Sequence, residues 1–193
     1  MDRGYRRPVK RVSVVGGSCA GKTTFGRTLA EILGAQFIEL DALNWEANWT
    51  MTELEEFKER VRAATVGDSW VADGNYGGRG ARDIVWSRAD TVVWLDLPLP
   101  LTLVRMWRRT TGRIRRREPL WGGNQETIRN TFFSRESLFV WALRTHRARR
   151  RNLLRLMGRS EFAHIEFHRL RSPRDAERWL ETQREAALSR IHG

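Results

Sequence analysis

The segment from Gly16 to Thr23 constrains the fold of this 193-residue chain more than any other part of it. It satisfies the pattern G-x-x-x-x-G-K-[ST], and its residues are Gly16, Gly17, Ser18, Cys19, Ala20, Gly21, Lys22 and Thr23. A β-rich run at residues 11–15 precedes the segment, and an amphipathic run at residues 22–33 follows it. A strand that enters a glycine turn and leaves it as a helix predicts a β-α-β unit, and therefore an α/β fold.

The residue types of this segment suit a phosphate group. Glycines allow consecutive backbone N–H groups to point inward around an anion, and the following helix adds the positive end of its dipole. Lys22 is expected to reach the β- and γ-phosphates, and the Thr23 hydroxyl to ligate Mg²⁺. We therefore predict that the P-loop and the adjoining Thr24 bind ATP with Mg²⁺. Cys19 occupies a variable position of the pattern, and we interpret it as an incidental small residue.

Composition and charge narrow the class of protein. Hydrophobic residues make up 40% of the chain and charged residues 30%, which is typical of a globular protein, and no apolar run is long enough to span a membrane. The single cysteine excludes an internal disulfide and predicts a cytoplasmic protein. The formal net charge is +12, and lysine occurs only at positions 10, 22 and 58. Arginine binds the phosphates of nucleotides and of nucleic acids alike, so the charge does not distinguish these partners.

Short β-rich runs alternate with longer helical periods along the rest of the chain, which predicts a largely parallel sheet in one domain. We expect strands at residues 11–15, 36–40, 69–72, 91–95 and 162–167. We expect helices at residues 22–33, near Pro100, within 125–157, and from Pro173 onward after Ser172. A further helix should follow Thr52, the expected N-cap, which forms a capping box with Glu55. Residues 110–124 combine glycines and arginines with few apolar side chains, so we expect a lid-like insertion there.

Three aspartates follow predicted strands, namely Asp41, Asp73 and Asp96. Because ligands gather at the carboxyl ends of parallel strands, all three are candidates for the site. An enzyme with a P-loop needs a second acidic group for Mg²⁺ at such a position. Leu97 and Pro98 follow Asp96 directly, and we interpret Asp96 as an aspartate that begins a turn.

These segments together resemble the adenylate-kinase-like small-molecule kinases, and most closely a bacterial group of P-loop proteins labelled FlaR-like or topology-modulation. The resemblance covers nearly the whole chain. Besides the P-loop it rests on Leu40-Asp41-Ala42-Leu43-Asn44-Trp45, on Trp-Val-Ala-Asp-Gly-Asn-Tyr at 70–76 and on Arg-Ala-Asp-Thr-Val-Val-Trp-Leu-Asp at 88–96. It implies a three-layer P-loop NTPase fold with a five-stranded parallel sheet, helices on both sides, and a small arginine-bearing lid.

The resemblance also implies roles for two of the aspartates. Asp73 would hold Mg²⁺ through water, and Asp41 would bind or deprotonate the phosphoryl acceptor. Adenylate kinases carry Thr-Gly after the second strand and Phe-Pro-Arg after Asp-Gly, whereas this chain has Leu40-Asp41 and Asp73-Gly74-Asn75-Tyr76. AMP is therefore not the expected acceptor, although a small-molecule acceptor in this region is. Trp45 and Trp49 are candidates for the wall of its pocket.

Arginines after the fourth predicted strand are candidate catalytic residues. Arg105 and Arg109 are four positions apart on a predicted helix and share a face, and Arg113 follows just past Gly112. The resemblance implies that such arginines open a lid, bind the ATP phosphates and stabilise the transferring group. The competing interpretation is a solvated basic helix face, and we favour the catalytic role.

A second basic run supports an alternative function. It contains Arg144, Arg147, Arg149, Arg150 and Arg151. No aromatic residues are interleaved with these arginines, so we favour a solvated helix face over a nucleic-acid-binding surface. The sequence thus predicts an ATP-dependent phosphotransferase that acts on a small molecule. The alternative is a nucleic-acid-associated ATPase.

Overall fold

A single parallel sheet of five strands organises the computed structural model, which describes residues 9–116, 121–123 and 138–191, without the side chains of 113, 114, 116, 138–142 and 191. The strands are β1 (Arg11–Gly16), β2 (Gln36–Glu39), β3 (Trp70–Asp73), β4 (Thr91–Leu95) and β5 (Glu166–Leu170). Their order is β2-β3-β1-β4-β5, and every neighbouring pair is parallel. The predicted α/β fold with a five-stranded parallel sheet is confirmed.

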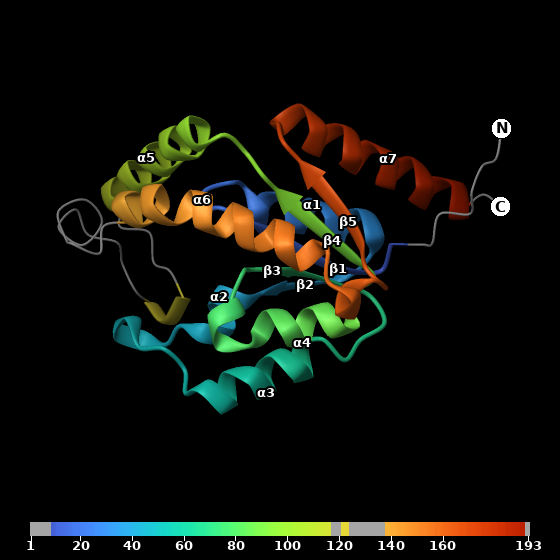
Figure 1. Cartoon of the computed structure of the whole chain (residues 1–193), viewed down its shortest axis with the longest axis horizontal. Helices are drawn as coiled ribbons and strands as arrows, with labels where there is room; N and C mark the ends of the chain where they lie inside the picture. Colours follow the sequence, from blue (N-terminus) through green and yellow to red (C-terminus); the bar gives the residue numbers. More distant parts are fainter. Residues whose placement is uncertain (1–8, 117–120, 124–137, 192–193) are drawn as a thin grey trace.

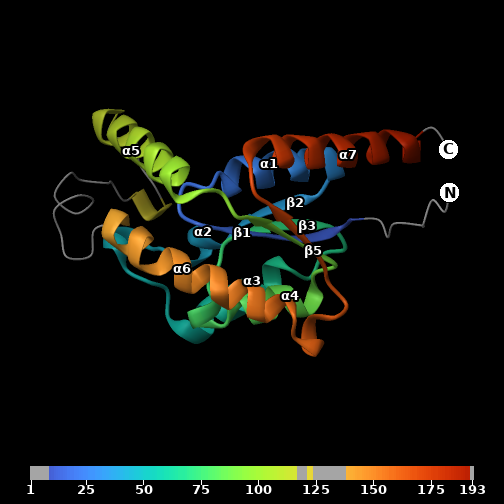
Figure 2. The same ribbon diagram turned by 45° about the horizontal axis from the view of Figure 1, so that its top comes forward.

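Helices cover both faces of this sheet (Figures 1 and 2). Helices α1 (Lys22–Leu33) and α7 (Pro173–Ile191) pack on one face, and α3 (Leu54–Ala64), α4 (Ala81–Arg88) and α6 (Leu138–Met157) lie on the other. The short α2 (Leu40–Asn44) and the long α5 (Leu99–Arg116) follow the carboxyl ends of β2 and β4. Because β1 lies between β3 and β4, the chain changes direction across the sheet at the end of β1, where parallel sheets bind ligands.

The strands alternate their side chains between two apolar cores. In β3, Trp70 and Ala72 face the core under α3, α4 and α6, whereas Val71 faces the core under α1 and α7. In β4, Trp94 faces the core under α3, α4 and α6, and Val93 faces the core under α1 and α7. Buried strands of a parallel sheet are covered on both faces, which explains their nearly continuous apolar sequence.

Helix α3 begins one residue later than the predicted capping box requires. The carboxylate of Glu53 accepts hydrogen bonds from the backbone N–H groups of Glu55 (2.8 Å) and Glu56 (3.2 Å), so Glu53 is the N-cap. The buried Thr52 hydroxyl instead lies 3.1 Å from the carbonyl oxygen of Leu43. The prediction of Thr52 as N-cap was wrong because its hydroxyl donates to the carbonyl oxygen of Leu43, nine positions earlier.

The fifth strand also lies later than predicted. Residues 160–162 form a 3₁₀ turn (Ser160–Phe162), and β5 covers Glu166–Leu170. The ring of Phe162 packs against Trp86 with a centroid distance of 5.0 Å, so this part of the apolar run fills the core from a turn. The next helix starts at Pro173, and the Ser172 hydroxyl accepts the backbone N–H of Asp175 at 3.1 Å, as predicted.

Residues 110–124 are only partly described. Helix α5 continues through Gly112 to Arg116, so the first part of the predicted insertion is helical. The short turn η3 (Trp121–Gly123) packs against η1 (Ala47–Trp49), while 117–120 and 124 lie outside the described residues. Within the described residues the following helix begins at Leu138, and residues 125–137 of its predicted range lie outside them. The sequence analysis did not predict α4.

We predict that Trp86→Phe lowers the free energy of unfolding by about 1–3 kcal/mol, because it leaves the buried Ser13 hydroxyl without its donor. The Trp86 indole N–H donates to the Ser13 hydroxyl at 3.1 Å and connects α4 to β1. Urea unfolding measures the change. Trp107→Phe is the control, because Trp107 is 55% exposed, and it should change the free energy by less than about 0.5 kcal/mol. Equal stability of Trp86→Phe and wild type would contradict the prediction.

Candidate active site

The loop between β1 and α1 forms a cradle, by which we mean residues 16–23. β1 ends at Gly16 and α1 begins at Lys22. A Cβ atom on Gly16 would lie 2.9 Å from the carbonyl oxygen of Leu95, so β4 approaches too closely for any side chain there. Gly21 has φ of 93° and Cys19 has φ of 57°. A left-handed conformation is uncommon outside glycine, so Cys19 has a defined backbone role in the turn.

A buried carboxylate lies beside the cradle. Asp73, at the end of β3, is 4% exposed, and its Oδ2 accepts a hydrogen bond from the Thr23 hydroxyl at 2.6 Å. The Lys22 ammonium lies 3.9 Å from Oδ1 of Asp73 and 3.4 Å from the carbonyl oxygen of Gly17. The structure thus brings together three residues that the sequence analysis assigned to ATP and Mg²⁺.

Burial governs the ionisation of Asp73. The pKa of this carboxyl group is raised above its ordinary value, mainly because burial disfavours the charged form. The charge of Lys22 and the hydrogen bond from Thr23 lower the pKa, the charge of Asp41 raises it, and that of Arg109 lowers it. Burial outweighs the favourable contacts, so the ionised form of Asp73 is less favourable in the folded protein than in water.

Asn75 holds the end of β1 in position. Its side-chain Oδ1 accepts the backbone N–H of Gly16 at 3.1 Å, and its Nδ2 donates to the Gly16 carbonyl oxygen at 2.7 Å. The Asn75 side-chain amide therefore pairs with both backbone groups of Gly16, as the backbone of a neighbouring strand would. The sequence analysis gave Asn75 no role, although its place two residues after Asp73 in a distinctive segment was a usable signal.

The three predicted lid arginines differ in their surroundings. Arg105 donates from Nη1 to the carbonyl oxygen of Ala20 at 3.1 Å, so it contacts the cradle directly. Arg109 is exposed, and its charge reaches Asp73. Arg113 lies on α5, but its side chain is outside the described part of the chain. Thr24 follows the cradle on α1 and is exposed.

Helix α6 contributes an arginine that the sequence analysis assigned to solvent. Nη1 of Arg149 lies 3.6 Å from the position that a Cβ on Gly17 would take, and its Nη2 donates to the Thr145 hydroxyl at 2.8 Å. Burial lowers the pKa of the Arg149 guanidinium. The interpretation of the whole run at 144–151 as a solvated face is therefore wrong for Arg149, which lies against the cradle.

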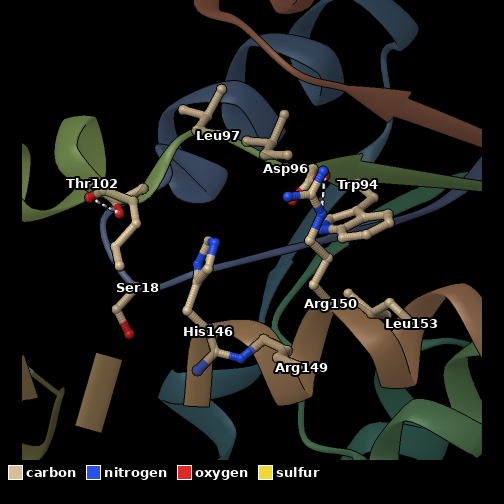
Figure 3. A pocket seen from close by; sticks show the side chains of 12 residues that line it. Ser18, Trp94, Asp96, Leu97, Thr102, His146, Arg149, Arg150 and Leu153 are labelled. Atoms are coloured by element: carbon tan, nitrogen blue, oxygen red, sulfur yellow. Dashed lines mark hydrogen bonds and ion pairs between the residues drawn. The ribbon is translucent and has the colours of Figure 1, made fainter. Parts of the chain in front are cut away.

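Asp96 connects two strands and a helix instead of beginning a turn. Its buried Oδ2 accepts hydrogen bonds from Nε (2.8 Å) and Nη2 (2.5 Å) of Arg169 on β5, and it lies 3.2 Å from Nε of Arg150 on α6. A cavity lies between the cradle, the end of β4 and α6, and in Figure 3 Arg150 extends across it from α6 to Asp96. Asp96 therefore holds α6 beside the cradle through Arg150, the residue that follows Arg149.

Asp41 lies on the other side of Asp73, in the first turn of α2. The Tyr76 hydroxyl donates a hydrogen bond to Oδ1 of Asp41, and the Tyr76 ring packs on Phe57 with centroids 5.2 Å apart. Burial, followed by the charge of Asp41, raises the pKa of Tyr76, so the phenol stays protonated as a donor. Trp45 and Trp49 pack edge to face at 5.6 Å near this pair.

The described residues contain no group of three or more His, Cys, Asp or Glu side chains that could hold a metal ion on their own. Mg²⁺, however, is commonly bound by one or two protein ligands together with substrate phosphates and water. Among the described atoms, the buried Oδ1 of Asp73 has no hydrogen-bond partner, and the Thr23 hydroxyl is adjacent. Asp73 and Thr23 therefore fit a Mg²⁺ ion that arrives with a nucleotide.

The cradle, the sheet order and the helices on both faces form a three-layer α/β fold that solved small-molecule kinases share. Comparison with solved structures agrees: shikimate kinase from Acinetobacter baumannii in complex with shikimate superposes with a TM-score of 0.55 and 22% identity, covering 94% of both chains. A gluconokinase from Sinorhizobium meliloti 1021 gives a TM-score of 0.53 and 18% identity, covering 96% of this chain and 95% of its own. Shikimate kinase from Bacteroides thetaiotaomicron gives 0.53 and 16%, covering 92% of this chain and 98% of its own.

No protein-family model matches the chain, and no curated protein matches it. The resemblance to the FlaR-like group stays a prediction from the sequence. In the described part of the chain, no helix combines the length and the apolar character needed to cross a membrane.

We predict that ionised Asp73 costs stability in the nucleotide-free protein. Because the folded-state pKa is raised, the folded protein binds more protons than the unfolded chain, so stability falls as pH rises from the unfolded value of 3.8 through the folded pKa. Asp73→Asn lacks this contribution, and its free energy of unfolding should exceed that of wild type more at pH 7 than at pH 4. Denaturant unfolding at several pH values measures the difference. A constant difference between the two proteins across this range would contradict it.

Proposed function

We propose that this protein is an ATP-dependent phosphotransferase that moves the γ-phosphoryl group of ATP to a hydroxyl group of a small molecule. The observation that carries the proposal is the meeting of Lys22, Thr23 and buried Asp73 at a glycine cradle. Structural similarity to P-loop small-molecule kinases supports the same class of reaction. A buried carboxylate beside a lysine and a hydroxyl is costly without a ligand, and Mg-ATP supplies the charges that balance it.

The triphosphate would lie along the cradle. Backbone N–H groups of the cradle after Gly16 and of the start of α1 would bind its oxygens, and Lys22 would contact the β- and γ-phosphates. Asp73 and Thr23 would hold Mg²⁺, which neutralises charge between the β- and γ-phosphates. The Thr23 hydroxyl donates its proton to Asp73, and its oxygen lone pairs would remain available to the metal, so this hydrogen bond would orient the hydroxyl as a ligand.

A second cavity fits the nucleoside part of ATP. It adjoins the cradle at Gly21 and Thr24, and Arg105 from α5 and Pro173 and Ala176 from α7 complete its wall. The base and ribose would lie in this cavity, beside the N-terminal end of α1. Arg105, which contacts both the cradle and this cavity, would bind the phosphate chain.

The transfer step forms a bond between the acceptor oxygen and the γ-phosphorus and breaks the bond from that phosphorus to the β,γ-bridging oxygen, which leaves with ADP. Negative charge on the transferring group is stabilised by Lys22 and by arginines at the rim. We assign this role to Arg105, Arg109 and Arg113 on α5, and to Arg149 on α6. Asp41 orients the acceptor hydroxyl and accepts its proton, while the Tyr76 hydroxyl holds the carboxylate in place.

We predict that Lys22→Ala weakens ATP binding at least about 10-fold and abolishes transfer, because a charge-assisted contact to the phosphates is lost. Lys58→Ala is the control, since Lys58 pairs with Glu55 on the surface of α3. Titration calorimetry measures binding, and ATP labelled at the γ-phosphate measures transfer to nucleosides, nucleotides, polyols and hydroxy acids. The proposal fails if no acceptor takes up label and Lys22→Ala binds ATP as wild type does.

A further inference from the structure

A basic groove runs between the start of α4 and the second half of α6, and it shares Arg149 and Leu153 with the cavity beside the cradle. Arg82, Arg149 and Arg159 line it, together with the amides of Asn75 and Asn152, and none of its described lining residues is acidic. We propose that this groove binds an acidic group of the phosphoryl acceptor, which is therefore an alcohol that carries a carboxylate or a phosphate. This inference rests on the proposed function, because it names the substrate class of the same site.

The inner end of the groove adjoins the cradle. Arg149 lines both the groove and the cavity beside Gly17. Asn75 lines the groove and also holds both backbone groups of Gly16. A molecule bound in the groove therefore has one end beside the residues that surround the γ-phosphate. This proximity is what distinguishes a substrate site from an incidental basic surface.

Arg82 is fixed in a position that suits an anion. Its Nε and Nη2 atoms donate to Oδ1 of Asp83 at 3.0 and 2.8 Å, and its guanidinium lies over the Trp86 ring at 5.8 Å from the centroid. A Cβ on Gly77 would lie 2.7 Å from Nη1, so a side chain at this position would displace the guanidinium from where it now lies. An arginine held in one place loses little freedom on binding a carboxylate or phosphate.

The other residues that line the groove indicate which further groups the ligand carries. Arg159 follows the end of α6 and pairs with Glu161 at 3.1 Å, outside the groove lining. Val15, Leu153 and Leu156 provide an apolar surface between the arginines. Charged groups around an apolar floor select a small molecule with a carbon skeleton and an acidic group. They do not favour a neutral polyol.

The groove also has a connection to the predicted base. Tyr76, which donates its hydroxyl to Asp41, precedes Gly77 in the chain, and Gly77 lines the groove. The turn η2 (Gly77–Arg79) thus joins the carboxylate that would orient the acceptor hydroxyl to the arginines that would hold its acidic group. An acceptor spanning these groups is held at two points.

The test uses the full chain with its cradle filled by Mg²⁺ and a non-hydrolysable ATP analogue, so that added anions cannot occupy the P-loop. Inorganic phosphate is titrated, potassium chloride of equal ionic strength serves as the reference, and the melting temperature is measured. We expect phosphate to raise the melting temperature of wild type. The half-saturating phosphate concentration should be at least about 10-fold higher in the double variant Arg82→Gln/Arg159→Gln. Arg155→Gln removes the same charge from an exposed site on α6 and should behave as wild type.

A second pair of variants keeps the charge unchanged. Gly77→Ala should push the Arg82 guanidinium aside and raise the half-saturating phosphate concentration, whereas Gly78→Ala meets no atom within 4 Å and should not. Malonate in place of phosphate distinguishes a carboxylate ligand from a phosphate ligand by which of the two saturates at the lower concentration. Equal half-saturation in wild type, the double variant and Gly77→Ala, or no response to either anion, would overturn the inference. Failure of the ATP analogue itself to stabilise the protein would instead contradict the proposed function.

Discussion

A carboxylate buried at the carboxyl edge of a parallel sheet is the constraint on which the rest of this site depends. Asp73 is paired in register with Val14 of β1, so it lies beside the strand that leads into the cradle. Taking a charge out of water is expensive unless hydrogen bonds and an opposite charge compensate. Lys22 and Thr23 compensate in part, and both are held in place by the first turn of α1. A cation that arrives with a triphosphate would complete the compensation.

The two sides of the cradle are built by different long-range contacts. On the side of β4, Asp96 binds Arg169 and Arg150 and thereby fixes α6, whose Arg149 lies against Gly17. On the side of β3, Asn75 and Tyr76 hold Gly16 and Asp41. Arg149 is half-buried against the cradle, whereas Arg150 stays exposed while it pairs with Asp96.

Features that depend only on residues close together in the sequence were predictable. The cradle, the start of α1 at Lys22, its end before Gly34 and the N-cap Ser172 all follow from neighbouring residue types, and the structure has them as predicted. Contacts between distant segments were not predictable in this way. Asn75 and Gly16 are 59 positions apart, and Arg169 and Asp96 are 73 apart. The N-cap of α3 was mispredicted because Thr52 is a preferred cap residue type, but its hydroxyl is held by the carbonyl oxygen of Leu43 and Glu53 caps the helix instead.

The most direct test of the account is the effect of Mg²⁺ on ATP affinity in wild type and Asp73→Asn. If Asp73 holds the metal between the cradle and the phosphates, Mg²⁺ should tighten ATP binding to wild type by about 10-fold or more and change binding to Asp73→Asn much less. Titration calorimetry with and without Mg²⁺ gives the four dissociation constants. An equal gain in affinity from Mg²⁺ in both proteins would contradict the central role of this carboxylate.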